Sequence, residues 1–383
     1  MPVFGKDLVK RIAVVIDPWD YPFNGTVVSA RRFVEALQPR FDFTLLAISP
    51  ADGRCDPRIT SFRQLSIPGF NGIINSMKAP LARPDRQRLK EVLEQCDLLH
   101  VQFPFFLAAG AISAAREMGK PVICSFHVQP ENVLRNVGLR SKFLARLLYK
   151  LFVATIYNRA DHVIAPSEFA LDLLKANGLS RPASVLSNGV PDAFFNLPDA
   201  RTNSDRFNLL SVGRLAGEKR HDLIMEAIAC SRHRDKISLK VVGAGPRETQ
   251  LRDKARALGI EASIGTASDD ELMAHYASAD IFVHAGEIEL EGMSVLEAMA
   301  SGNLVLLSDS SGSAATELVA DPDARFDHRD PRDLAGKIDR WLADSAGRAR
   351  VAGQNRERAR RRAHAFSVTE LASIYDRLLG DVS

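Results

Sequence analysis

The feature that most restricts the fold of this chain is a series of short apolar runs that alternates with helical patterns and then starts again. In the first half, five runs rich in β-branched residues are separated by helical stretches. Strands that are apolar throughout and joined by helices are typical of a parallel sheet covered by helices on both faces. The five runs are RIAVVID, FTLLAIS, LLHVQFP, PVICSFH and HVIAPS.

The same pattern returns after Pro191, with the runs FNLLSVGRL, SLKVVGAG, ASIGT, ADIFVHAG and LVLLSD. Between the two series, the polar segment 196–206 has the composition of a linker. A chain of 383 residues is also longer than one compact core usually supports. We therefore predict an α/β protein of two doubly wound domains, residues 1–190 and 191–366. We expect the last helix, about residues 367–383, to pack back on the first domain.

In open α/β sheets, ligands bind beyond the carboxyl ends of the strands. Two such domains in tandem therefore predict a site in an inter-domain cleft. Charge is divided unevenly between the halves. Residues 1–190 carry 24 Lys and Arg against 16 Asp and Glu, and the remainder carries 26 against 31. We expect the basic half to meet an anionic partner.

Several classes of protein are disfavoured by composition. No apolar run reaches the roughly 18 residues that a bilayer span requires, and the run Ile12–Ile16 is too short for a signal-peptide core. The arginines between Arg348 and Arg362 have no aromatic residues among them, which favours a solvated helix over a nucleic-acid surface. The four cysteines lack the spacing of a disulfide framework or a zinc site, so we expect a cytoplasmic setting.

Two carboxylates flank a glycine in ELEGMSVLEAMASG, residues 289–302. The part from Gly292 onward is predicted to be a helix that follows the strand ADIFVHAG. Gly292 then lies at a helix N-terminus, where backbone amides favour a phosphate and the missing Cβ allows close approach. Glu289 lies on the preceding loop, and Glu297 lies one turn beyond Met293. Because a carboxylate accepts hydrogen bonds from two adjacent hydroxyls, this pair suits the two diols of a nucleotide sugar.

Two cations follow a strand in SVGRLAGEKRHDL. The guanidinium of Arg214 and the ammonium of Lys219 suit the many oxygens of a diphosphate. Taken alone, such a pair is more often solvated, and it is the acidic motif that favours a ligand role. The stretch GAGPRE, residues 243–248, is only a partial dinucleotide fingerprint. A plain strand-to-helix turn and contact with the nucleotide base both remain open for it.

The first half supplies three further candidates. Gly25 opens a helix in YPFNGTVV and could face the donor phosphates. His127 ends the run PVICSFH, a position at which a lone histidine is usually structural. His100 similarly ends a strand, and both lining the cleft and supporting it from behind remain open for this residue.

Together, these motifs resemble the retaining glycosyltransferases of family 4. Glu289 and Glu297 match that family's glutamate–seven–glutamate motif, and SNGV, VGRLAGEK and VVGAGP occur in its order. The resemblance covers nearly the whole chain and implies the GT-B fold, two Rossmann-like domains facing a cleft, with the donor on the second. It implies that Glu289 holds hydroxyls of the donor sugar and Glu297 the ribose. The diphosphate would be bound by Arg214 and Lys219, assisted by amides near Gly292, Met293 and Ser294.

The implied reaction is transfer of a hexose from a nucleoside diphosphate sugar with retention, with His127 and Glu289 as the catalytic candidates. His127 matches the family's cleft histidine and would position or polarise. The only Asp-x-Asp, at 321–323, follows a helix and is predicted to be a turn, so we expect no metal and no cofactor. We favour a UDP-sugar over a GDP-sugar. Two departures leave the sugar open: Glu291 stands where the family often has an aromatic residue, and Asn24-Gly25 where it has Gly-Gly.

The acceptor is suggested by residues 136–160. No acidic residue lies between Glu131 and Asp161, and Lys142, Arg146 and Lys150 form one helical stripe beside apolar residues. This composition is typical of a helix on an anionic membrane, although a helix that buries its apolar arc against the sheet is the alternative. Together with SFHVQPEN, the segment resembles family members that glycosylate diacylglycerol lipids. We therefore predict a peripheral enzyme on the cytoplasmic face of a membrane, with a lipid or lipid-linked acceptor.

Three other functions remain as alternatives. The chain could act on a soluble sugar or polysaccharide acceptor, or it could be a GT-B-type nucleotide-sugar epimerase that needs no acceptor. A binding module without catalysis is a third alternative, against which the intact set of Arg214, Lys219, Glu289 and Glu297 argues. We expect no nucleic-acid partner.

Overall fold

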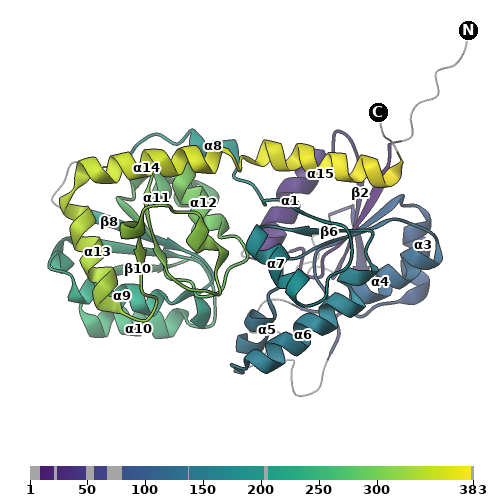
Figure 1. Ribbon diagram of the computed structural model, residues 1–383, viewed down its shortest axis with the longest axis horizontal. Coiled ribbons are helices and arrows are strands. Elements are labelled where there is room, and N and C mark those ends of the chain that lie inside the picture. The colour runs from purple at the N-terminus through teal and green to yellow at the C-terminus, as the bar shows by residue number, and fades with distance from the viewer. Residues whose placement is uncertain are drawn as a thin grey trace, which may run out of the picture. The chain divides into compact units, whose positions relative to one another are not determined.

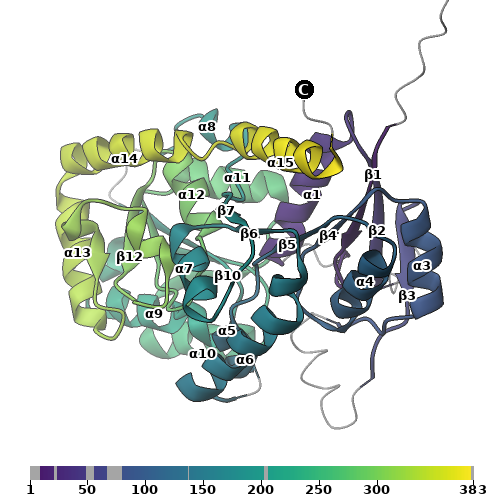
Figure 2. The same ribbon diagram turned by 45° about the vertical axis from the view of Figure 1, so that its right-hand side comes forward.

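The computed structural model describes residues 9–20, 24–48, 56–66, 80–136, 138–201 and 206–380. The chain forms two compact units (Figures 1 and 2). Unit 1 comprises Met1–Pro130, Ser141–Leu186 and Val368–Ser383, and unit 2 comprises Glu131–Arg140 and Ser187–Ser367. The chain therefore crosses between the units close to the two positions that the sequence suggested. It also crosses twice more around residues 131–140, which the sequence analysis did not foresee.

Unit 1 is built on a parallel sheet of seven strands in the order β3-β2-β1-β4-β5-β6-β7. The central strands β4, β5 and β6 are buried at every residue, which explains why apolar residues predominate in them; each also contains one polar residue, His100, Ser125 or His162. The two edge strands, β3 and β7, were not predicted, because only one residue of β3 and none of β7 is fully buried. The bounds are β1 (Arg11–Val15), β2 (Asp42–Ile48), β3 (Ile59–Phe62), β4 (Leu98–Val101), β5 (Val122–Ser125), β6 (His162–Ala165) and β7 (Ala183–Val185).

The C-terminal helix α15 (His364–Leu379) contributes to the core of unit 1 from Val368 onward. It lies beside α1 (Gly25–Leu37) in both views (Figures 1 and 2). Leu371, Ile374 and Tyr375 join the cluster formed by α1 and β1, and the Tyr375 ring meets Phe41 edge-on at 5.3 Å between centroids. The other helices among the described residues of this unit are α3 (Arg86–Glu94), α4 (Phe106–Glu117), α6 (Lys142–Thr155) and α7 (Glu168–Ala176).

Unit 2 contains a parallel sheet of six strands in the order β10-β9-β8-β11-β12-β13. Five of them are the predicted apolar runs, and the sixth, β13, is a two-residue edge strand. The bounds are β8 (Phe207–Val212), β9 (Ile237–Val242), β10 (Glu261–Gly265), β11 (Ile281–His284), β12 (Leu304–Ser308) and β13 (Arg325–Phe326).

Helices cover both faces of the unit 2 sheet, with α9 against α10 and α13, and α12 against α14. From the central strands the chain winds outward in both directions, so each sheet has one topological switch point. It lies between β1 and β4 in unit 1 and between β8 and β11 in unit 2. The helices are α5 (Pro130–Asn136), α8 (Asp192–Phe195), α9 (His221–Cys230), α10 (Glu248–Leu258), α11 (Asp269–Ser278), α12 (Met293–Ala300), α13 (Pro331–Ala343) and α14 (Ser345–Arg360).

Candidate functional site

The predicted donor residues of unit 2 lie on two loops that leave the neighbouring strands β8 and β11 at the switch point. The first loop carries Arg214 and the 3₁₀ turn Gly217–Lys219, and the second carries Glu289 and leads into α12. The amide of Glu287 donates to the Glu218 carbonyl at 2.8 Å and ties the loops together. Ligands of doubly wound sheets bind at this kind of position.

Lys219 and Glu289, one from each loop, form an ion pair. The Lys219 ammonium donates to Glu289 Oε1, and His284 Nε2 lies 3.3 Å from the same oxygen. Burial opposes ionisation of Glu289, but Lys219 and His284 outweigh it and lower the pKa of Glu289 to about 2. Glu289 is therefore ionised at every physiological pH. His284 was not among the sequence candidates, although its place at the end of β11 was a usable signal.

Arg214 is paired in the same way. Its guanidinium donates to Glu218 Oε1, and the Glu218 side chain is only 3% exposed. Both candidate cations are thus held by carboxylates, while 30% of the Arg214 side chain and 17% of the Lys219 side chain remain exposed. A diphosphate would meet cations that are already oriented, and it would share or replace their carboxylate partners.

Gly292 is the N-cap of α12 and has φ 97°, in the left-handed region that favours glycine. A Cβ at this position would lie 3.0 Å from Ala315 Cβ, so the packing also favours glycine. Met293 and Ser294 begin the helix, where the first amides lack partners within the helix and can bind an anion. The turn therefore has the form that the sequence predicted.

Glu297 lies one turn into α12 and is 6% exposed. Its Oε2 accepts a hydrogen bond of 3.1 Å from the Tyr276 hydroxyl of α11, which fixes the carboxylate. The structure thus brings Arg214, Lys219 and Glu289 together around the two loops, with Glu297 on the helix that follows. Their roles toward a donor remain predictions.

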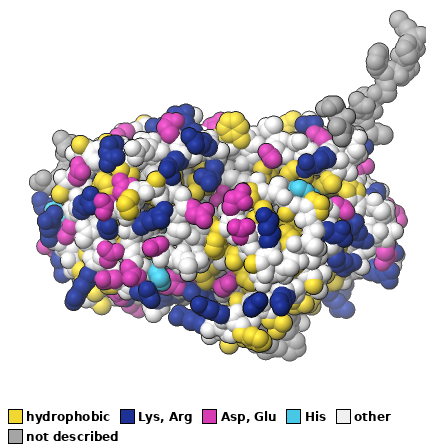
Figure 3. Space-filling view, in the orientation of Figure 1, with side chains coloured by type: hydrophobic (Ala, Val, Ile, Leu, Met, Phe, Trp, Pro, Cys, Tyr) yellow, Lys and Arg dark blue, Asp and Glu magenta, His cyan; other side chains and the backbone are white. Residues whose placement is uncertain are grey.

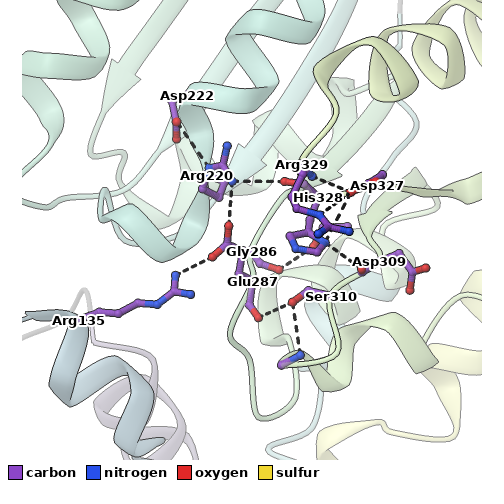
Figure 4. Close-up of polar contacts among 12 residues, drawn as sticks. Arg135, Arg220, Asp222, Gly286, Glu287, Asp309, Ser310, Asp327, His328 and Arg329 are labelled. Carbon is purple, nitrogen blue, oxygen red and sulfur yellow. Dashed lines mark hydrogen bonds and ion pairs between the residues drawn. The ribbon is translucent and has the colours of Figure 1, made fainter. Parts of the chain in front are cut away.

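A network around Glu287 braces the two loops (Figure 4). Arg220, which has a left-handed backbone at φ 49°, donates to Glu287 Oε1 at 2.8 Å and to the His328 carbonyl at 3.3 Å. Arg135 of α5 donates to Glu287 Oε2 at 2.7 Å, and the Ser310 hydroxyl donates to the Glu287 carbonyl. Burial opposes ionisation of Glu287, but Arg220 and Arg135 outweigh it and lower its pKa. Glu287 was not among the predicted site residues, because its side-chain partners are distant along the chain.

The glycines of GAGPRE have a packing role. A Cβ on Gly243 would lie 2.0 Å from the Gly213 carbonyl oxygen, and one on Gly245 would lie 2.4 Å from that of Leu215. The Leu215 amide donates to the Ala244 carbonyl at 2.9 Å, so this turn supports the loop that carries Arg214. Contact with a nucleotide base remains a prediction.

The first-half candidates belong to unit 1. His100 is a buried support: its Nδ1 is 2.7 Å from the Tyr375 hydroxyl, and its Nε2 is 2.8 Å from the Ser125 hydroxyl. Burial, with a smaller contribution from His127, lowers the pKa of His100 to about 3. His127 follows β5 and is half-buried, and desolvation lowers its pKa to about 4, so both histidines are neutral at pH 7.

Gly25 begins α1 and is exposed. The preceding Asn24 is the N-cap, and its side-chain oxygen accepts a 3.0 Å hydrogen bond from the Thr26 amide. An Asn-Gly pair therefore stabilises the start of this helix through a side-chain cap, which a Gly-Gly pair could not supply.

The Asp-x-Asp segment is a turn, as predicted. Asp321 accepts from the Asp323 amide at 3.0 Å, and Asp323 pairs with Lys337 and Arg340 at 3.1 and 2.5 Å. Over the part of the chain that the structure describes, no cluster of three or more His, Cys, Asp or Glu side chains could hold a metal ion.

Helix α6 exposes part of its apolar surface. The exposed fractions of Phe143, Leu147 and Leu151 are 75%, 55% and 51%. The alternative, in which the helix buries its whole apolar arc against the sheet, therefore does not hold for these three residues. Ala145, Tyr149, Phe152 and Val153 form the buried face instead, and Lys142, Arg146 and Lys150 lie exposed beside the apolar stripe.

In Figure 3, yellow and dark-blue side chains lie side by side at the lower edge, where Figure 1 places α6. None of the helices within the described residues has the length and apolar character needed to cross a bilayer.

Two family models match successive parts of the chain. The first, Glycosyltransferase Family 4, matches residues 23–194, and the second, Glycosyl transferases group 1, matches residues 194–361. The chain is 28% identical over 260 residues to alpha-monoglucosyldiacylglycerol synthase of Streptococcus pneumoniae, covering 64% of this chain and 58% of that protein. The chain thus spans less than two thirds of this relative. It is 29% identical over 366 residues to GDP-mannose-dependent alpha-mannosyltransferase of Mycobacterium tuberculosis, covering 90% and 93%.

Solved structures show the same architecture. Sucrose-phosphate synthase from Thermosynechococcus elongatus matches with a TM-score of 0.74 at 17% identity, covering 97% of this chain and 100% of that one. HepE from Anabaena, solved in complex with UDP and glucose, matches with a TM-score of 0.75 at 16% identity, covering 96% and 100%. At these identities the likeness concerns the fold alone, and it confirms the predicted arrangement of two Rossmann-like domains.

Proposed function

The chain belongs to glycosyltransferase family 4 and has the GT-B fold, and from that membership we propose that it transfers a hexose from a nucleoside diphosphate sugar to a lipid or lipid-linked hydroxyl, with retention at the anomeric carbon. The part of this proposal that concerns the sugar donor rests on the convergence of Arg214, Lys219 and Glu289 at the switch point of unit 2. UDP is the favoured nucleotide.

Donor binding would rearrange the resting ion pair. Lys219 exchanges part of its contact with Glu289 for an oxygen of the diphosphate, and Glu289 then accepts hydrogen bonds from the hexose hydroxyls. As the bond from the anomeric carbon to the diphosphate breaks, negative charge grows on the departing oxygens. Lys219, Arg214 and the N-terminus of α12 are already oriented, so they stabilise this charge without the reorganisation that surrounding water molecules would need. Glu297, fixed by Tyr276, is assigned to the ribose.

In a single step without a covalent glycosyl-enzyme intermediate, retention requires the acceptor to attack on the face from which the leaving group departs. The acceptor oxygen bonds to the anomeric carbon, the electron pair of the broken bond goes to the diphosphate, and the departing phosphate takes the hydroxyl proton. His127 is assigned to position or polarise the reacting groups. With its pKa lowered to about 4 by desolvation, it is neutral at pH 7 and can donate or accept a hydrogen bond.

The acceptor class is supported by α6. Exposed apolar residues beside exposed basic residues suit the boundary between acyl chains and anionic headgroups. Each basic residue near such a surface contributes about 1 kcal/mol, so Lys142, Arg146 and Lys150 could hold the enzyme there reversibly. The relative that glycosylates diacylglycerol agrees with this assignment. We place the enzyme on the cytoplasmic face of the membrane.

Vesicle co-sedimentation of the full chain tests the membrane part. We expect binding to vesicles that contain phosphatidylglycerol, weakening with salt, and loss of most binding when Lys142, Arg146 and Lys150 are changed together to Gln. The matched control changes three exposed arginines of and just after α14, Arg350, Arg358 and Arg361, to Gln and removes the same charge from elsewhere. Equal binding to neutral vesicles, or equal loss in the control, would leave a soluble sugar or polysaccharide acceptor as the better assignment.

Product analysis tests the reaction. We expect a glycosylated lipid and free nucleoside diphosphate when donor and acceptor are both present. An epimerase would instead release nucleotide and an altered sugar without an acceptor. The nucleotide is identified by thermal shift with UDP, GDP and ADP, since a ligand at 100 times its dissociation constant stabilises the protein by about 2.7 kcal/mol.

A further inference from the structure

Glu291, the carboxylate at a position that is often aromatic in the family, lies buried next to the donor helix. Its side chain is 5% exposed and accepts hydrogen bonds from two residues of the SNGV segment. Oε1 accepts from the Ser187 hydroxyl, and Oε2 accepts from the Asn188 side-chain amide at 2.5 Å and from the Asn188 backbone amide at 3.1 Å. Glu291 therefore anchors the first residues of unit 2 after the crossing at Leu186–Ser187.

The second long-range crossing of the chain, at Ser367–Val368, is anchored at the same place. The Val190 amide donates to the Arg362 carbonyl at 2.8 Å, and the His364 amide donates to the Val190 carbonyl at 2.9 Å. His364 Nδ1 lies 3.1 Å from the Asn188 carbonyl. Gly189 has φ 76°, and a Cβ there would lie 2.6 Å from His364 Cα, so the two segments are in tight contact.

Glu291 directly precedes Gly292, the N-cap of the helix α12. One buried carboxylate thus connects the proposed phosphate-binding end of α12 with the segments on which the chain leaves unit 2 in both directions. Residues 187–190 and 362–367 are hereafter called the crossing clamp. Burial raises the pKa of Glu291, which is consistent with a side chain whose partners are mostly neutral hydrogen-bond donors.

We propose that Glu291 is a positioning residue for sugar transfer, because it fixes the crossing clamp against the N-terminus of the donor helix. This inference rests on the proposed function. Transfer requires an acceptor oxygen about 3–3.5 Å from the anomeric carbon, and a displacement of about 1 Å can cost roughly 100-fold in rate. A water molecule that hydrolyses the donor needs no such alignment with unit 1. Loosening the clamp should therefore slow transfer more than hydrolysis.

A polarity exchange tests this assignment. Glu291→Gln leaves one accepting oxygen for the three donors that now share two, and it puts an amide donor against either the Ser187 hydroxyl or the Asn188 side chain. Asn188→Asp supplies an acceptor in return, so the double variant restores the hydrogen bond with reversed polarity. We expect Glu291→Gln and Asn188→Asp each to lower the ratio of transfer to donor hydrolysis at least tenfold, with UDP affinity changed less than threefold. The double variant should return to within threefold of the wild-type ratio.

The assay uses UDP-glucose with vesicles containing diacylglycerol and phosphatidylglycerol. An unchanged ratio in Glu291→Gln, or a double variant no better than the single ones, would overturn the proposal. Ser187→Ala removes one hydrogen bond to the same carboxylate and should give a smaller decrease. It takes the place of Glu291→Gln if that variant does not fold.

Hydrogen exchange separates failure of this inference from failure of the proposed function. The amides of Val190 and His364 should exchange at least tenfold faster in Glu291→Gln and regain protection in the double variant. This measurement needs no substrate. If no donor and acceptor pair gives transfer but these amides respond as expected, the proposed function fails and the clamp stands. If the amides do not respond, the clamp is wrong whatever the enzyme transfers.

Discussion

The carboxyl ends of the two parallel sheets carry opposite chemistry. In unit 2, the loops after β8 and β11 hold ionised groups in pairs, Lys219 with Glu289 and Arg214 with Glu218. The pKa of Glu289 is lowered to about 2 because Lys219 and His284 outweigh the effect of burial. This end of the sheet is suited to an anion, which can take over contacts with cations already in place.

In unit 1, burial shifts the corresponding groups toward their neutral forms. Asp17, which lies just after β1, is 1% exposed, and its Oδ1 accepts from the Ala82 amide at 2.7 Å. Burial raises the pKa of Asp17 from 3.8 to about 7, whereas it lowers those of His100 and His127 to about 3 and 4. Two sheets of the same topological class thus differ in the residues at the carboxyl ends of their central strands. The carboxyl end of the unit 2 sheet suits a charged ligand, and that of the unit 1 sheet suits an uncharged group such as a hydroxyl.

The largest effect is expected from removing a cation of unit 2. Lys219→Ala and Arg214→Ala each delete a charge-assisted contact that strengthens as the diphosphate departs. Each should cost roughly 2.7–4 kcal/mol of transition-state stabilisation, about 10²–10³ in kcat/KM. Steady-state kinetics of sugar transfer provides the measurement. Lys236→Ala, which removes an exposed lysine of the same unit, should leave kcat/KM unchanged.

Full turnover in both cation variants would contradict the assignment of the carboxyl end of the unit 2 sheet to diphosphate binding. A loss confined to KM would instead mean that the cations bind donor and transition state equally well.

The next largest effect is the pH dependence of the free energy of unfolding that Asp17, at the carboxyl end of the unit 1 sheet, should cause. Because the pKa of Asp17 is raised in the folded protein, the unfolded chain loses this proton first, and stability falls as pH rises from about 4 to 7. At about 1.4 kcal/mol per unit, the loss between pH 5 and pH 8 is roughly 2–3 kcal/mol. Asp17→Asn should remove this part of the pH dependence. Urea unfolding at several pH values measures it.

Glu94→Gln, which changes an exposed carboxylate of α3, should keep the wild-type slope of unfolding free energy against pH. If Asp17→Asn also keeps that slope, Asp17 is ionised at neutral pH. The difference in charge between the carboxyl ends of the two sheets is then smaller than we infer.

The contrast between the units also bears on what the sequence could predict. Central strands were predicted because they are buried on both faces and therefore mostly apolar. The edge strands β3, β7 and β13 were missed because they are short and only partly buried. The exposed stripe of α6 could not be distinguished from its buried face by composition, since both consist of apolar residues at helical spacing.

The candidate donor residues can be recognised in the sequence where a motif holds them within a few positions, as with Glu289 and Glu297, and their roles stay predictions. Two buried carboxylates that support the neighbouring segments, Glu291 and Glu287, were not predictable, because their partners are remote in sequence. Glu291 meets Ser187 across 104 residues, and Glu287 meets Arg135 across 152. Only the fold brings such pairs together, so a single sequence gives no local signal for them.

The smallest effect separates the two carboxylates of the donor motif. Glu289→Gln keeps one accepting oxygen, so its weaker contact with the hexose should cost about 1.5 kcal/mol, roughly tenfold in affinity for the intact sugar nucleotide. Free UDP has no hexose, and its affinity should stay unchanged or rise slightly because Lys219 loses its charged partner. Glu297→Gln should instead weaken UDP and UDP-sugar alike, since its assigned contact is the ribose. Titration calorimetry with both ligands measures the four affinities. Equal losses of affinity for free UDP in the two variants would show that Glu289 acts through the diphosphate rather than the sugar. The charged groups at the carboxyl end of the unit 2 sheet would then bind the nucleotide alone.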